Sequence, residues 1–61
     1  MTEFEIIKNA LSRVRADLDI YDFPTEKSIF FPINSLMAEG IIQFELVFDG
    51  EGKLVNTNTW D

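Results

Sequence analysis

The sequence predicts an α+β fold in which one N-terminal amphipathic helix packs on a three- to four-stranded antiparallel meander sheet. Three observations favour this class. Apolar residues recur at helical spacing near the N-terminus, later residues alternate in short strand-like runs, and Pro24 and Asp49–Gly52 mark tight turns between those runs. Because the 61 residues contain no linker or repeat, we expect one small domain, 1–61.

The helix is predicted over about Glu3–Leu18, where apolar residues recur in steps of three and four. Thr2 and Glu5 fit a capping box, in which the hydroxyl accepts from the Glu5 amide and the carboxylate reaches back. Near the other end, Arg13 and Asp17 are four residues apart and are expected to pair. The apolar stripe is short, which favours burial against a sheet over a coiled coil. Its members are Phe4, Ile7, Leu11, Val14 and Leu18.

Four strand-like runs follow the helix. Pro32 has no amide hydrogen, so the second strand is expected to end there or to lie at an edge. The segment 34–40 has two interpretations: one capped helical turn, or continuation of the second strand after a bulge with a turn at 38–40. The expected strands are Asp19–Phe23, Ser28–Phe31, Ile41–Phe48 and Lys53–Trp60.

Alternation along these strands assigns side chains to two faces of the sheet. The buried face and the helix stripe together give the expected core: Phe4, Ile7, Leu11, Val14, Leu18, Ile29, Phe31, Ile42, Phe44, Leu46 and Phe48. The other face carries more apolar surface than solubility requires, which indicates an interface or a surface covered by the 34–40 loop. Its expected residues are Phe30, Ile41, Gln43, Glu45, Val47, Val55 and Thr57, joined by Tyr21 or Phe23.

Catalytic and metal-binding chemistry is disfavoured by composition. The chain has no histidine and no cysteine, so it lacks the usual proton shuttle, the strongest nucleophile and the common ligands of zinc. The Asp49–Gly52 segment does not fit an EF-hand, because Lys53 and Leu54 stand where a ligand and a glycine are needed. We therefore expect no enzyme activity, no cofactor and no bound metal.

The net charge of −6 indicates the kind of partner. It disfavours direct nucleic-acid binding and favours encounter with basic surfaces. No apolar run is long enough to cross a membrane and no signal peptide is recognisable, so we expect a cytoplasmic protein. In size, acidity and lack of catalytic groups the chain resembles the small inhibitors that phages and other mobile elements encode. The resemblance implies an inhibitor or modulator that docks on a basic, often nucleic-acid-binding, surface of a larger protein.

The residues expected to contact that protein partner combine acids, which supply complementary charge, with aromatic anchors. A self-assembling homodimer, with sheets packed face to face or edge strands paired, is the alternative. A carboxylate-only enzyme or ligand-binding domain, using acids such as Asp49, is the least favoured hypothesis. The predicted partner-binding residues are Asp17, Asp19, Tyr21, Asp22, Phe23, Glu26, Phe30, Glu45 and Val47.

Overall fold

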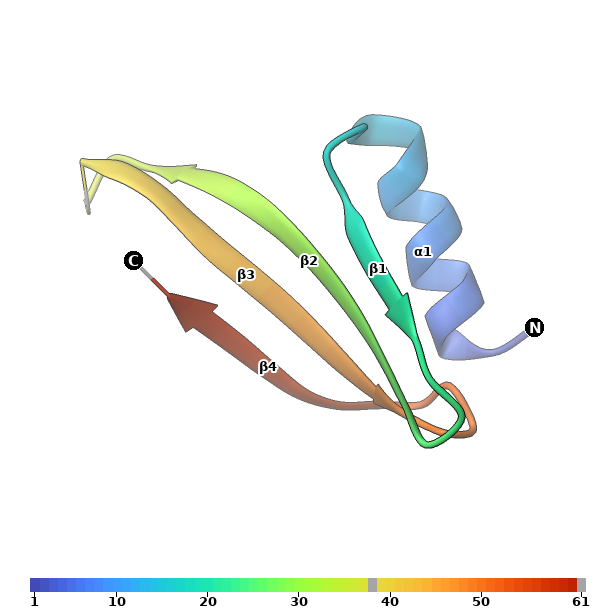
Figure 1. Ribbon diagram of the computed structural model, residues 1–61. Helices are drawn as coiled ribbons and strands as arrows, with labels where there is room; N and C mark the ends of the chain where they lie inside the picture. The colour runs from blue at the N-terminus through green and yellow to red at the C-terminus, as the bar shows by residue number, and fades with distance from the viewer. Residues whose placement is uncertain (38, 61) are drawn as a thin grey trace.

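The computed structural model describes residues 1–37 and 39–60, and shows one helix followed by a four-stranded antiparallel sheet (Figure 1). The strands lie in the order β1-β2-β3-β4, so each strand pairs with its neighbour in the sequence. The predicted α+β class is confirmed, with four strands. Helix α1 spans Glu3–Val14, and β1, β2, β3 and β4 span Asp19–Asp22, Glu26–Ser35, Gly40–Asp49 and Leu54–Trp60.

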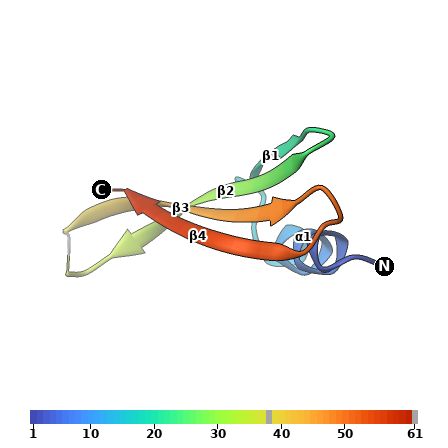
Figure 2. The ribbon, with the colours of Figure 1, turned by 90° about the horizontal axis from the view of Figure 1, so that it is seen from below.

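The sheet is longer than the helix beside it. β2 and β3 pair from Glu26 opposite Asp49 to Ser35 opposite Gly40, whereas β1 reaches along β2 only as far as Phe30. Helix α1 lies at the same end of the sheet as β1, so the far part of the β2–β3 hairpin extends beyond it (Figures 1 and 2). We call residues 32–37 and 39–43 the projecting hairpin.

The buried core lies between α1 and one face of the sheet. Phe4 of α1 packs edge-to-face on Phe48 of β3, with ring centroids 5.2 Å apart. Ile29 and Phe31 of β2 complete the buried cluster. The partly buried residues that pack against this cluster are Ile7, Leu11, Leu18, Phe44 and Leu46.

Two predicted core residues lie elsewhere. Val14 is 77% exposed, because α1 ends there rather than near Leu18. Arg15 already has an extended backbone, and its amide makes a last bond to Leu11. Ile42 is only half-buried and lies on the projecting hairpin, outside the buried cluster.

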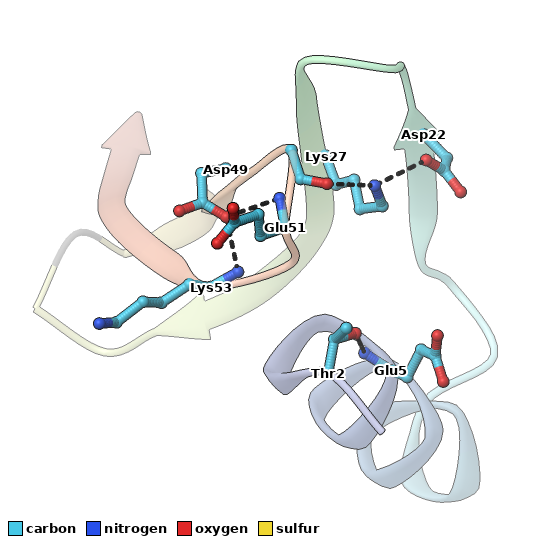
Figure 3. A network of polar contacts seen from close by, with 8 residues as sticks. Thr2, Glu5, Asp22, Lys27, Asp49, Glu51 and Lys53 are labelled. Carbon is cyan, nitrogen blue, oxygen red and sulfur yellow. Dashed lines mark hydrogen bonds and ion pairs between the residues drawn. The ribbon is translucent and has the colours of Figure 1, made fainter.

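The start of α1 is fixed to the β3–β4 turn. Thr2 caps the helix as predicted, since its hydroxyl accepts from the Glu5 amide at 3.2 Å (Figure 3). A second side chain of the helix start, the Glu3 carboxylate, accepts from the Leu54 amide of β4 at 2.8 Å. The Phe4 amide donates to the carbonyl of Gly52 at 2.8 Å. The helix is therefore anchored by backbone bonds as well as by apolar packing.

The β3–β4 turn is organised by one side chain. A carboxylate oxygen of Asp49 accepts from the amides of Glu51 and Lys53, both at 2.9 Å (Figure 3). Gly52 has a φ of +82°, and a Cβ there would lie 2.7 Å from the Cβ of Thr2. Both the backbone conformation and the contact with the helix cap therefore require glycine.

Strand β2 continues past Pro32, contrary to one of the two expectations for that residue. Because β1 pairs no further than Phe30, Pro32 lies on an edge, where a missing amide hydrogen costs no ladder bond. The β2–β3 register is regular to Ser35, so the bulge expected in the second interpretation is wrong, while the helical turn expected after Asn34 or Ser35 includes Ala38. The strand does continue, as the second interpretation required; of its predicted turn 38–40, Ala38 lies outside the described residues.

Candidate protein-binding face

The sheet face opposite α1, which we call the open face, is built by alternate residues of the four strands. Three of the rows of side chains that the strand register places across this face span three or four strands. The rows are Tyr21, Ser28, Val47 and Asn56; then Asp19, Phe30, Glu45 and Asn58; then Pro32, Gln43 and Trp60.

Four aromatic side chains form a continuous series of contacts on this face, and we call them the aromatic row. Phe23 stacks on Tyr21 with centroids 6.5 Å apart, and Tyr21 meets Phe30 edge-on at 5.5 Å. Phe30 in turn stacks on Trp60 at 6.0 Å. Three of the four side chains are well exposed: Phe23 by 59%, Tyr21 by 49% and Trp60 by 47%.

The sheet geometry explains how these rings meet. Tyr21 lies opposite Ser28, so Phe30 is its diagonal neighbour across the β1–β2 pair, within reach of an aromatic side chain. Phe30 and Trp60 come from β2 and β4, which β3 separates. Two strand spacings amount to about 10 Å, so only large rings bridge that distance.

Two shallow hollows lie on either side of the contact between Tyr21 and Phe30. The Asp19 hollow is lined by Asp19, Tyr21, Phe30, Gln43 and Trp60. The Glu26 hollow is lined by Tyr21, Phe23, Glu26, Ser28, Phe30 and Glu45. Each hollow therefore combines aromatic walls with at least one carboxylate.

The charges on the open face have one sign among the described residues. Asp19, Glu26 and Glu45 line the hollows, and the Glu45 carboxylate accepts from the Asn58 side chain at 2.9 Å. The basic residues lie elsewhere, on or just after α1, in the β3–β4 turn, or on the helix side of β2. They are Lys8, Arg13, Arg15, Lys27 and Lys53.

Most of the predicted partner-binding residues come together here. Val47 lies on the open face but is only 9% exposed, so it offers little contact surface. Asp22 faces the helix side, 3.4 Å from the Lys27 ammonium. Asp17 lies before β1, outside the three rows. Those that line the hollows are Asp19, Tyr21, Phe23, Glu26, Phe30 and Glu45.

The ion pair predicted between Arg13 and Asp17 is wrong. Asp17 pairs with Arg15 instead, through two hydrogen bonds of 2.8 and 3.0 Å. These bonds hold the pKa of the Asp17 carboxyl below its ordinary value.

Trp60 was not predicted to lie on the open face, because a β-bulge in β4 was not predicted. The β3–β4 register shifts at Val47/Phe48, so Phe48 is opposite Leu54 while Val47 is opposite Asn56. The extra residue moves every later side chain of β4 to the other face. Trp60 therefore lies opposite Gln43 on the open face. For the same reason Thr57, expected on the open face, lies opposite Leu46 on the helix side.

The acids that a carboxylate-only enzyme would use are dispersed. Asp17 is bound by Arg15, Asp22 by Lys27, Glu45 by Asn58, and Asp49 by the amides of its own turn. Within residues 1–37 and 39–60, no group of three acids is placed to hold a metal ion.

No helix in the described part of the chain is both long and apolar enough to span a bilayer. Comparison with known protein families, with curated proteins and with solved structures finds no match. The function is therefore inferred from the geometry and charge of the open face.

Proposed function

We propose that the protein is a non-catalytic protein-binding module that inhibits or modulates a larger protein by docking its open face on a basic surface of that partner. One observation carries the proposal. The aromatic row is exposed between carboxylates, on a face where no described residue is basic. Exposed aromatic groups of this kind anchor protein interfaces, and like charges around them select a partner of opposite charge.

The exposure of the rings supports a binding role over a structural one. Tyr21 and Phe23 come from β1 and the residue after it, at the edge of the sheet. Leaving these rings half in water forgoes roughly 25 cal/mol of stabilisation for each Å² of apolar surface not buried. A partner that covers them recovers that energy, which matters to a domain this small.

Affinity capture from cells of the source organism, followed by mass spectrometry, tests the proposal. The chain is compared with a Tyr21→Ala/Phe23→Ala double variant and with a Leu36→Ala/Met37→Ala control. The control truncates two exposed apolar residues at the tip of the projecting hairpin. We expect the chain and the control to recover the same basic protein, and the open-face variant to lose it while keeping its circular dichroism spectrum.

Salt dependence adds a second criterion. Attraction between exposed charges is screened within about 10 Å at 0.1 M ionic strength, so recovery of the partner should fall as salt is raised. Recovery that is unaffected by Tyr21→Ala/Phe23→Ala would overturn the proposal, because the open face would then not be the binding surface.

Self-association is the second candidate, and the projecting hairpin favours it. Leu36 and Met37 are 99% and 98% exposed, and they border a hollow lined also by Ile33, Ile42 and Phe44. None of the described residues that line this hollow is charged, which favours contact there between two copies of an acidic chain. Light scattering at micromolar concentration should then give a dimer that Leu36→Asp converts to a monomer. A monomeric wild-type chain would exclude this candidate.

A further inference from the structure

The protein places its own cations over its own aromatic rings on the helix side of the sheet. The Lys8 and Lys27 ammonium groups lie 5.5 and 5.9 Å from the centre of the Phe4 ring. The Arg15 guanidinium lies 5.4 Å from the centre of the Phe31 ring. Among the described residues, no such contact reaches the aromatic row of the open face. Its rings therefore remain available to a cation from another molecule.

Each hollow of the open face combines an aromatic ring with a carboxylate, which is the combination that best binds an arginine side chain. A guanidinium is planar and weakly hydrated, so it stacks on an aromatic ring while its N–H groups bond a carboxylate. The Asp19 hollow offers the rings of Phe30 and Trp60 with the Asp19 carboxylate. The Glu26 hollow offers the ring of Phe23 with the carboxylates of Glu26 and Glu45. A lysine ammonium matches the charge but not the flat shape.

The spacing of the hollows determines what can fill both at once. The Asp19 hollow includes Gln43, which lies opposite Pro32, and the Glu26 hollow includes Ser28. Phe30 lines both hollows and lies between them, so the two hollows are on either side of one residue of β2. Along a strand, side chains two residues apart point the same way and are about 7 Å apart. An extended segment therefore fits both hollows with side chains i and i+2.

We propose that the open face binds an extended segment of the partner that carries arginine at positions i and i+2, with one guanidinium in each hollow. This inference rests on the proposed function and adds the recognised sequence to it. Tyr21 and Phe30 line both hollows, so they form the wall between the two arginines.

Trp60, the single tryptophan of the chain, provides the readout. Its fluorescence is titrated with capped peptides that lack aromatic residues and carry Arg-Thr-Arg, adjacent Arg-Arg, or Lys-Thr-Lys in the same Gly-Ser frame. The second peptide keeps the charge but points its side chains to opposite sides, and the third keeps charge and spacing. We expect Arg-Thr-Arg to bind about tenfold more tightly than either, since one lost cation–π and carboxylate contact is worth about 1.4 kcal/mol.

Charge-neutral variants show whether both hollows are used. Asp19→Asn and Glu26→Gln each remove one carboxylate from one hollow, whereas Glu5→Gln and Glu51→Gln remove the same charge from exposed positions elsewhere. We expect each hollow variant to weaken Arg-Thr-Arg binding severalfold, and each control to change it less than twofold. Equal losses in all four variants would overturn the proposal, because net charge alone would then drive binding.

The outcomes separate this inference from the proposed function. Equal affinity for the three basic peptides overturns the paired-arginine site. Failure of all peptides, while the captured partner still requires Tyr21 and Phe23, overturns it too but leaves the protein-binding function standing. Failure of peptides and capture alike overturns both.

Discussion

Both faces of the sheet carry aromatic side chains, but these are buried on one face and exposed on the other. On the helix side, Phe4, Phe31 and Phe48 are buried and lie in one cluster. On the open face, Tyr21 and Phe23 are stacked on each other yet remain about half exposed. Because aromatic residues occur on both sides, aromatic content alone does not distinguish a core from a binding surface.

Charge distinguishes the two faces. The helix side places Lys8, Lys27 and Arg15 over its rings, whereas the hollows of the open face carry Asp19 and Glu26 and no described cation. Rings covered by the protein's own helix and cations stabilise the fold. Rings left between carboxylates provide a surface for a basic partner.

The sharpest test of this difference compares Phe48→Ala with Phe23→Ala. Phe48 is fully buried, and removing such a ring costs about 3–5 kcal/mol, which is enough to unfold a domain of this size. Phe23 is 59% exposed, so its loss should cost about 0.5 kcal/mol. Urea unfolding followed by circular dichroism measures both. Similar losses for the two variants would mean that the open face is also a structural core.

The second largest loss of stability is expected where the start of α1 contacts the β3–β4 turn. Gly52→Ala should destabilise the protein by roughly 1–3 kcal/mol, because it forces a side chain into a positive φ and against Thr2. In a Thr2→Gly background the steric part of the loss should disappear, while the cost of the backbone conformation remains. Thermal unfolding of the single and double variants checks this. If Thr2→Gly gives no relief, the helix start and the turn are not in contact.

A smaller effect is expected from Lys27→Met, which keeps the aliphatic stem but removes the charge. The Lys27 ammonium lies 3.4 Å from both an Asp22 carboxylate oxygen and the Gly50 carbonyl (Figure 3). It also lies 5.9 Å from the centre of the Phe4 ring. Together these contacts should be worth about 1 kcal/mol. Lys53→Met makes the same charge change in the exposed β3–β4 turn and should leave the urea midpoint nearly unchanged.

The fold was predictable where local chemistry decides it. The Thr2 cap, the turn at Asp49–Gly52 and the alternation of β3 each depend on residues close together in the sequence. The end of α1 was not predictable in this way, because the apolar spacing continues to Leu18 after the backbone has become extended at Arg15. Leu18 still packs against the core, but from the loop that leads into β1.

The residues of the open face were predictable where the alternation of side chains between the two faces of a strand could be followed in the sequence. Asp19 and Asp22 look equivalent in composition, yet β1 places one on the open face and the other beside Lys27. The face on which Trp60 lies depends on a β-bulge that no local residue pattern predicts. One extra residue in β4 moves the Trp60 side chain to the other face of the sheet. Sequence therefore indicates the residue types of the surface, and the register decides which of them meet.

The smallest effect concerns Asp17, a predicted partner-binding acid outside the open face. Hydrogen bonds from Arg15 hold the pKa of its carboxyl below the ordinary value of 3.8. A folded-state pKa below the unfolded one gives stability that is present above the unfolded pKa and lost as pH falls through the folded pKa. A carbon-detected NMR titration should show the Asp17 pKa rising toward 3.8 in Arg15→Gln. Asp17→Asn should leave Arg-Thr-Arg binding unchanged, because this acid is held by the chain's own arginine. If binding falls as far as in Asp19→Asn, the interface extends beyond the sheet, and the contrast between its two faces is incomplete.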